Sequence, residues 1–87
     1  MTSLAIETDT RVDDVRFDAD SLIVSLKDGR TISAPLAWFP RLLNANPDEL
    51  AHWEIAGGGF GLYWPDLDED LSTDGLLRGA PSVDARR

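Results

Sequence analysis

Two short alternating segments, Ser21–Leu26 and Thr31–Ala34, constrain the fold of this chain more than any other feature. Successive side chains of a β-strand point to opposite faces, so this alternation predicts two strands. Leu22, Val24 and Leu26 then share one apolar face of the first strand. Only four residues separate the two segments, so we expect them to pair as an antiparallel hairpin.

The loop length fixes the register of this hairpin. A two-residue loop, Asp28-Gly29, would set Ser25 opposite Ile32 and mix polar with apolar side chains on one face. A three-residue loop sets Val24 opposite Ile32 instead. It also places Gly29 where a left-handed residue follows a type I turn. We therefore predict the three-residue loop.

The other elements follow from periodicity, caps and turn residues. In chain order they are a strand at Val12–Phe17, a main helix around Trp38–Leu43 with Pro40 in its first turn, a short helix at Pro47–His52 capped by Asn46 and Glu49, strands at Trp53–Ala56 and Phe60–Trp64 joined by Gly57–Gly59, and a last helical turn capped by Ser72 and closed by Gly79. The sequence thus predicts an α+β domain at residues 11–80, ordered β-β-β-α-α-β-β-α. It consists of a small antiparallel meander and hairpin packed with one main helix and short helical turns. Residues 1–10 are expected to be a flexible lead and residues 81–87 a tail.

Spacing also predicts which side chains form the core. Phe39 and Leu43 are four residues apart, which would place both on one helical face. In the last predicted strand Phe60 shares a face with Leu62 and Trp64, whereas Tyr63 takes the other face. The side chains expected to be buried together are Leu22, Val24, Ile32, Phe39, Leu42, Ile55, Leu62 and Trp64.

Composition limits the classes of partner. The 87 residues carry a net charge of −8, and the excess of acids is concentrated in residues 46–87, with nine acids and three bases. Such a field repels phosphate backbones and anionic lipid and attracts basic proteins. We therefore expect no direct nucleic-acid binding and no membrane binding. The acidic surface is interpreted either as a means of keeping a small domain soluble, which the charge alone favours, or as a docking surface for a basic protein partner. The absence of cysteine, of a signal peptide and of a long apolar segment predicts a cytoplasmic protein.

Four carboxylates, Asp66, Asp68, Glu69 and Asp70, follow Trp64-Pro65 within five residues. Their spacing resembles the start of a calcium loop, but leucines occupy the positions of the required glycine and bidentate glutamate, which excludes an EF-hand. A weak, partly hydrated cation site remains an alternative. The favoured interpretation is that these acids stabilise the positive end of the helix that follows.

No catalytic constellation is recognised. Leu62 stands where a dinucleotide fingerprint needs its third glycine, so Gly57–Gly59 is interpreted as a hairpin turn. The sequence contains no Gly-x-Ser-x-Gly nucleophile elbow, which argues against a serine triad with His52, the only histidine. His52 is expected to interact with the carbonyls at the end of its helix. Arg41 and Arg78 are interpreted as solvated helix residues. We therefore expect no enzymatic activity, no catalytic residue, no metal and no cofactor.

Several segments together resemble one known family of small bacterial proteins, domain of unknown function 2442. They are Ala34–Leu42, Gly57–Asp66, Leu67–Ser72 and Gly75–Gly79, and the similarity extends from Val12 to Gly79. The resemblance implies an α+β fold but no established activity and no catalytic residues. Some relatives carry an added helix-turn-helix domain that this sequence does not contain. Others are encoded beside a second small protein, in pairs suspected to be toxin–antitoxin-like.

The sequence thus favours a protein–protein interaction module, with an antitoxin-like role beside a small basic protein. The candidate docking residues are Tyr63, Asp66, Asp68, Glu69 and Asp70. Complementary charge would speed encounter and fix register there. The alternative is a small enzyme or metal-dependent hydrolase that uses the four carboxylates.

Overall fold

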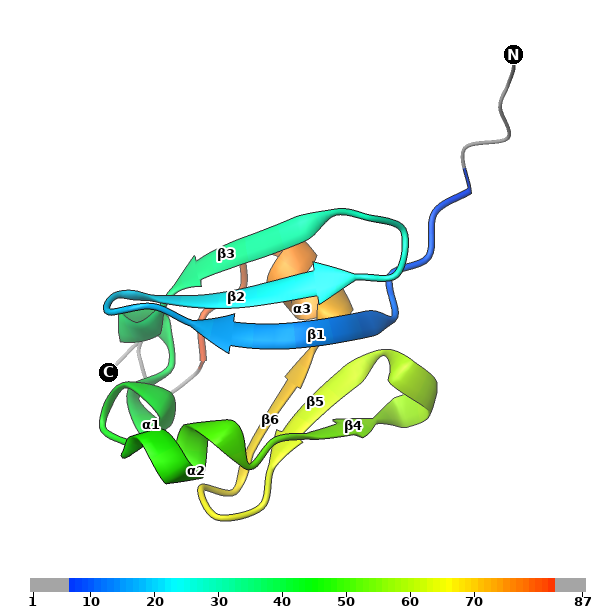
Figure 1. Cartoon of the computed structure of the whole chain (residues 1–87). Helices are drawn as coiled ribbons and strands as arrows, with labels where there is room; N and C mark the ends of the chain where they lie inside the picture. Colours follow the sequence, from blue (N-terminus) through cyan, green and yellow to red (C-terminus); the bar gives the residue numbers. More distant parts are fainter. Residues whose placement is uncertain (1–6, 83–87) are drawn as a thin grey trace.

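The computed structural model describes residues 7–82, which form two small antiparallel sheets with short helices at their margins (Figure 1). In chain order the elements are β1 (Val12–Phe17), β2 (Ser21–Leu26), β3 (Thr31–Pro35), the 3-10 turn η1 (Leu36–Trp38), α1 (Pro40–Leu43), α2 (Pro47–Ala51), β4 (Glu54–Ala56), the 3-10 turn η2 (Gly57–Gly59), β5 (Gly61–Trp64), β6 (Glu69–Ser72) and α3 (Thr73–Arg78). The predicted α+β class is confirmed. Most of the expected lead (residues 1–6) and tail (residues 83–87) lies outside the described residues.

The first sheet has the order β1-β2-β3 and the predicted hairpin register. Val24 pairs with Ile32, as expected for a three-residue loop. Gly29 closes that loop with a φ of +94°, a conformation that glycine adopts without steric penalty. Loop length, register and glycine placement are therefore confirmed together.

Asp28 in the same loop fastens the start of the described chain to the sheet. The amide of Asp9 donates to Asp28 Oδ2 at 3.0 Å, and the Asp28 amide donates to the Asp9 carbonyl at 3.2 Å. Arg30 adds a hydrogen bond from its Nη2 to Asp28 Oδ2 at 2.8 Å. The Arg30 guanidinium and the Asp9 amide hold the pKa of the Asp28 carboxyl well below its ordinary value.

The predicted main helix is divided at Pro40. A residue before proline is sterically excluded from the helical region, and Phe39 accordingly has φ −132° and ψ 80°. The result is the turn η1 followed by α1, which begins with Pro40 in its first turn as expected. Because Phe39 is not helical, it and Leu43 do not share a face: Phe39 is 1% exposed and Leu43 is 50% exposed. The predicted pairing of these two side chains is wrong.

Helix α2 begins with the predicted capping box. The Asn46 side chain accepts a hydrogen bond from the Glu49 amide at 2.8 Å, and Glu49 Oε1 accepts from the Asn46 amide at 3.0 Å. These bonds satisfy two amides that a helix start leaves without intrahelical partners. Pro47 occupies the first helical position, where no N–H is needed.

The second sheet has the order β4-β5-β6, and its third strand was not predicted. The segment expected to run from β5 into a helix instead turns back and pairs along β5, with Leu71 opposite Leu62. Helix α3 starts only after this strand. Its predicted caps are confirmed, because Ser72 Oγ accepts from the Gly75 amide at 2.9 Å and Gly79 ends the helix with a φ of +73°.

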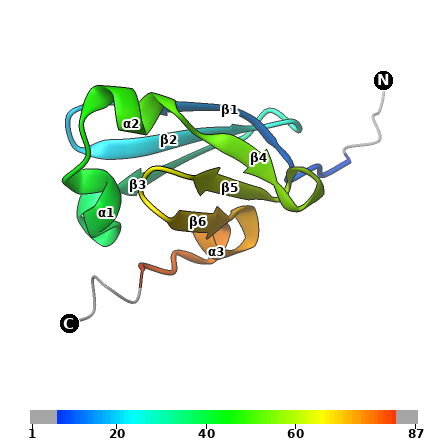
Figure 2. The same ribbon diagram turned by 90° about the horizontal axis from the view of Figure 1, so that it is seen from below.

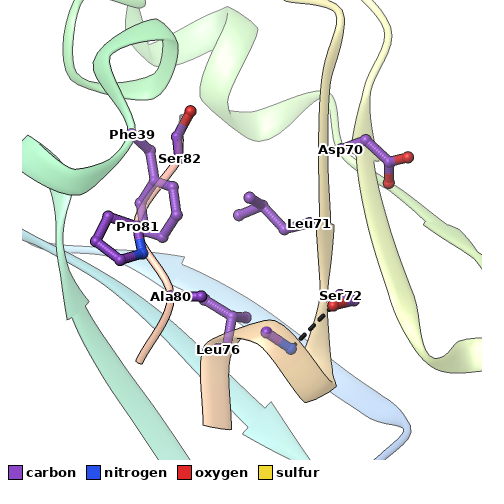
Figure 3. Close-up of a pocket in the computed structure, with 9 residues that line it drawn as sticks. Phe39, Asp70, Leu71, Ser72, Leu76, Ala80, Pro81 and Ser82 are labelled. Carbon is purple, nitrogen blue, oxygen red and sulfur yellow. Dashed lines mark hydrogen bonds between the residues drawn. The ribbon is translucent and has the colours of Figure 1, made fainter. Parts of the chain in front are cut away.

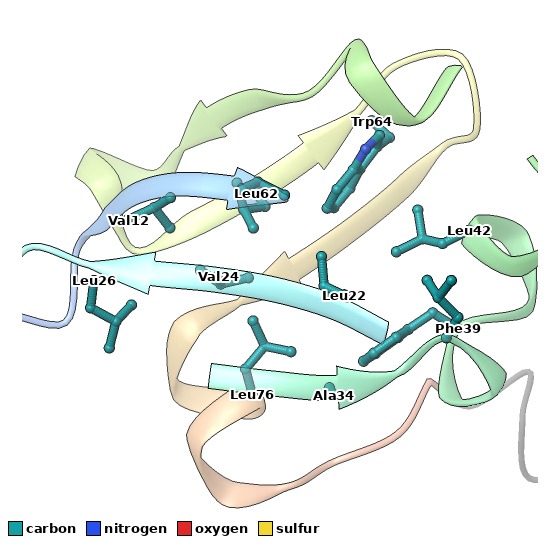
Figure 4. Close-up of a cluster of buried hydrophobic side chains, with 12 residues drawn as sticks. Val12, Leu22, Val24, Leu26, Ala34, Phe39, Leu42, Leu62, Trp64 and Leu76 are labelled. Carbon is teal, nitrogen blue, oxygen red and sulfur yellow. The ribbon is translucent and has the colours of Figure 1, made fainter. Parts of the chain in front are cut away.

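The core lies between the two sheets, where β2 side chains face those of β5 (Figure 4). Its buried apolar members are Val12, Val15, Leu22, Val24, Leu26, Ala34, Leu36, Phe39, Leu42, Leu62, Trp64 and Leu76. Leu76 reaches this core from α3, and Phe39 and Leu42 close one end (Figure 4). None of the helices in residues 7–82 is long and apolar enough to cross a bilayer.

Six of the eight predicted core residues are buried, and the other two lie on strands at the edges of the sheets. Ile32 is half-buried on β3, and Ile55 is 49% exposed because β4 is an edge strand. Phe60, expected on the inner face, precedes β5 at the end of η2 and is also 49% exposed. The alternation of apolar residues thus shows which face of each strand points inward, but it does not show where along that face the core ends.

Leu62→Ala should lower the free energy of unfolding by about 2–5 kcal/mol, because it removes a fully buried side chain from the centre of the core. Ile55→Ala on the neighbouring strand is the matched control and should cost less than about 1 kcal/mol. Urea denaturation of both variants measures the difference. Equal losses would show that the core is not centred on β5.

Candidate functional site

The acidic run forms the tip of the β5–β6 hairpin. The Leu67 amide donates to the Trp64 carbonyl at 3.1 Å, so the chain turns immediately after β5, with Pro65 in the second position of the turn. Asp68 follows with a φ of +51°, a left-handed conformation that aspartate tolerates better than most residues. Trp64 then pairs with Glu69, and β6 begins.

This geometry overturns the interpretation of the run as the start of a helix. Asp74 is the one acid in the first turn of α3, and the four predicted carboxylates precede that turn in the hairpin loop and in β6. A helix dipole acts within its first turn, so it does not account for them.

A row of polar side chains crosses the outer face of the second sheet. Glu54 on β4 pairs with Tyr63 on β5. Tyr63 in turn pairs with Asp70 on β6. Paired residues of neighbouring strands point to the same face, and Leu62 and Trp64 point to the other. We call Glu54, Tyr63 and Asp70 the outer row. Figure 2 looks toward this sheet from below, and none of the described helices crosses in front of it.

Glu69 does not belong to that surface. It pairs with Trp64, shares the inward face with Leu71, and is 8% exposed. Its Oε1 accepts a hydrogen bond from the Asp70 amide at 3.3 Å. Of the five predicted docking residues, Tyr63, Asp66, Asp68 and Asp70 therefore reach the surface of the hairpin, and Glu69 is buried behind it.

Asp66 contacts the histidine that follows α2. His52 Nδ1 lies 2.8 Å from Asp66 Oδ2, although the two residues are 14 positions apart in the sequence. Through this hydrogen bond and its charge, Asp66 raises the pKa of His52 above the ordinary value of 6.5, and Glu54 adds a smaller effect. The imidazole of His52, expected to interact with the carbonyls at its helix end, is hydrogen-bonded to Asp66 instead.

Arg41 also contacts the hairpin tip, at Asp68. Its Nη1 donates to the Asp68 carbonyl at 2.6 Å and lies 3.9 Å from the Asp68 carboxylate. Arg41 is exposed, as expected for a solvated residue, but it is not isolated, because it contacts Asp68. Arg78 pairs with Asp74 one helical turn away, at 3.1 Å. Together, Arg41 and His52 tie the hairpin tip to the segment that contains α1 and α2.

A shallow pocket of about 170 Å³ lies between β6, α3 and residues 80–82 (Figure 3). Its side chains are mainly apolar, contributed by Phe39, Leu71, Leu76, Ala80 and Pro81. The hydroxyl of Ser72 is engaged in capping α3, and the Asp70 carboxylate points away from Phe39 (Figure 3). The pocket therefore does not bring the acidic residues together.

The four carboxylates do not converge as a shared metal or acid–base site would require. Asp66 faces His52, Asp68 faces Arg41, Glu69 points inward and Asp70 points outward. Within residues 7–82, no group of three or more histidine, cysteine or acidic side chains is placed to hold a metal ion. The surface carries negative charge at two places. At the hairpin tip, Asp66 and Asp68 contact His52 and Arg41, and on the outer face of the sheet Asp70 lies beside Tyr63.

The family of the chain follows from its sequence. Residues 12–82 match the family described as "Protein of unknown function (DUF2442)". The chain belongs to this family. The resemblance found in the sequence is thereby confirmed. No curated protein matches the sequence.

Two solved structures resemble this one. A crystal structure of a protein of unknown function from Rhodospirillum rubrum matches with a TM-score of 0.72 and 38% identity, over 86% of this chain and 93% of that one. A solution NMR structure of an uncharacterized protein from Chromobacterium violaceum matches with a TM-score of 0.70 and 26% identity, over 83% of this chain and 68% of that one. Neither description assigns an activity.

An NMR titration should show a pKa for His52 above its ordinary value of 6.5, and Asp66→Asn should lower that pKa because the largest counter-charge is lost. Glu54→Gln should lower it by less. The stabilisation from this pair is full below pH 6.5 and is lost as the pH rises through the raised pKa of His52. An unchanged His52 pKa in Asp66→Asn would show that the two side chains do not pair in solution.

Proposed function

We propose that this domain is a protein–protein interaction module that binds a basic partner protein through the outer face of its second sheet. The observation that carries the proposal is the outer row, in which Tyr63 lies between Glu54 and Asp70 on three paired strands. Tyrosine supplies a rigid contact area with a polar tip, and flanking carboxylates select arginine and lysine.

The hairpin tip extends this surface. Asp66 and Asp68 are 44% and 90% exposed as side chains, so a partner can reach both of them. Their contacts with His52 and Arg41 hold the tip in place and offset part of its charge. We therefore assign the outer row to partner binding and the tip residues to positioning and to longer-range attraction.

A protein partner suits the charge of the domain. A net charge of −8 disfavours nucleic acid and anionic membranes through simple repulsion. Related chains are suspected to work in pairs with a second small protein. We therefore take the partner to be the product of a neighbouring gene and the role of this chain to be antitoxin-like.

The test is the affinity for that neighbouring gene product, measured by calorimetry across a salt series. Glu54→Gln combined with Asp70→Asn should weaken binding roughly two- to thirtyfold at low salt and flatten the salt dependence, since each exposed charge contributes about 0.2–1 kcal/mol.

The matched control combines Glu7→Gln with Asp20→Asn. It removes the same two charges from exposed positions outside the second sheet. A general effect of net charge would weaken binding equally in both double variants. That result, or unchanged binding of the outer-row variant with an intact fold, would refute the docking surface.

A further inference from the structure

The two long sides of the sheet pair are closed differently. Helix α3 contacts both β3 and β6 and covers the side between those two strands (Figure 1). On the other side the free edge of β1 faces α2 and Trp53, which precedes β4, across a groove of about 620 Å³. The groove is lined by Val15, Arg16, Phe17, Pro47, Leu50, Ala51 and Trp53.

The lining of this groove is continuous with the core. Phe17, Leu50 and Trp53 pack against the buried cluster but remain only partly buried themselves. Covering them would remove further apolar surface from water, a favourable change of about 25 cal/mol per Å² before the costs of association. The groove thus contains apolar surface that no other part of residues 7–82 covers fully.

The β1 edge supplies hydrogen-bonding groups along the same groove. The Asp18 amide donates to the Ser21 carbonyl, and in an antiparallel ladder such bonded pairs alternate. Arg16 therefore bonds toward β2, whereas the N–H and C=O groups of Val15 and Phe17 point toward the open side. The bulge between Val12 and Asp14 distorts only the other end of the strand.

The charges beside the groove select the occupant. The elements β1 and α2 carry Asp13, Asp14, Asp48 and Glu49 against one base of their own, Arg16, which lines the groove. Lys27 lies 3.7 Å from the Asp13 carboxylate and offsets one further charge, so the surroundings of the groove stay net negative. A second copy carries the same net charge of −8, so like-charge repulsion between the two chains disfavours it as the occupant. An extended segment that alternates apolar and basic side chains fits the apolar lining, the strand edge and the charge together.

We propose that this groove binds an extended apolar and basic segment of a partner protein, which pairs with Val15 and Phe17 as a fourth strand of the first sheet. The sign of the partner's charge rests on the proposed function, but the groove is a second surface, formed by β1 and α2 rather than by the outer row.

The test uses an eight-residue peptide of alternating valine and lysine and an otherwise identical valine–glutamate peptide, each added at millimolar concentration to the ¹⁵N-labelled protein. The basic peptide should shift the amide signals of Val15, Phe17 and Trp53 and slow hydrogen exchange at Val15 and Phe17. Ala51→Arg, at an exposed position in the groove lining, should weaken this response roughly fivefold or more through bulk and repulsion. Ala37→Arg, exposed and outside the groove, should leave it unchanged.

Three results would overturn the proposal: no response at Val15 and Phe17, an equal response to the glutamate peptide, or an unaltered response in Ala51→Arg. Concentration-dependent protection of the same amides without peptide would assign the edge to a second copy and equally overturn it. Shifts confined to Glu54, Tyr63 and Asp70 would refute the groove while leaving the proposed function intact. A groove response that is unchanged by Glu54→Gln with Asp70→Asn would support the groove even if the outer row fails its own test.

Discussion

The indole of Trp64 joins the parts of this domain. Its side chain is fully buried between the sheets, and its N–H donates to the Leu50 carbonyl of α2 at 3.0 Å. Its ring meets Phe17 of β1 edge-on, with centroids 6.2 Å apart. One side chain on β5 therefore contacts the other sheet and a helix while keeping its polar atom satisfied, as a buried tryptophan requires. The turn at Pro65 follows directly, so the place of the acidic hairpin depends on this packing.

The elements that were predicted correctly are those specified by neighbouring residues. The register of the first hairpin followed from Gly29 and from the requirement that Val24 face Ile32. The capping box of Asn46 and Glu49 follows from a local pattern of residue types. In both cases the interactions span few residues, so the sequence contains nearly all the information that decides them.

The elements that were missed depend on distant partners. Glu69, Asp70, Leu71 and Ser72 have little intrinsic preference for strand, and they form β6 because β5 offers a free edge and a buried face. The contacts of Arg41 with Asp68 and of His52 with Asp66 require that hairpin to exist first. Composition predicted an acidic surface, but only the pairing of β5 with β6 separates Asp70 on the outside from Glu69 on the inside. That division could not be seen in a run of consecutive acids.

If the proposed partner also reached the hairpin tip, the contact between His52 and Asp66 would link its binding to protons. If an arginine of a bound partner takes over the Asp66 carboxylate, His52 loses the counter-charge that raises its pKa. Near neutral pH the imidazole then releases part of its proton as the complex forms. By linkage, the complex would tighten as the pH rises through that range, and the heat of association would vary with the ionisation enthalpy of the buffer.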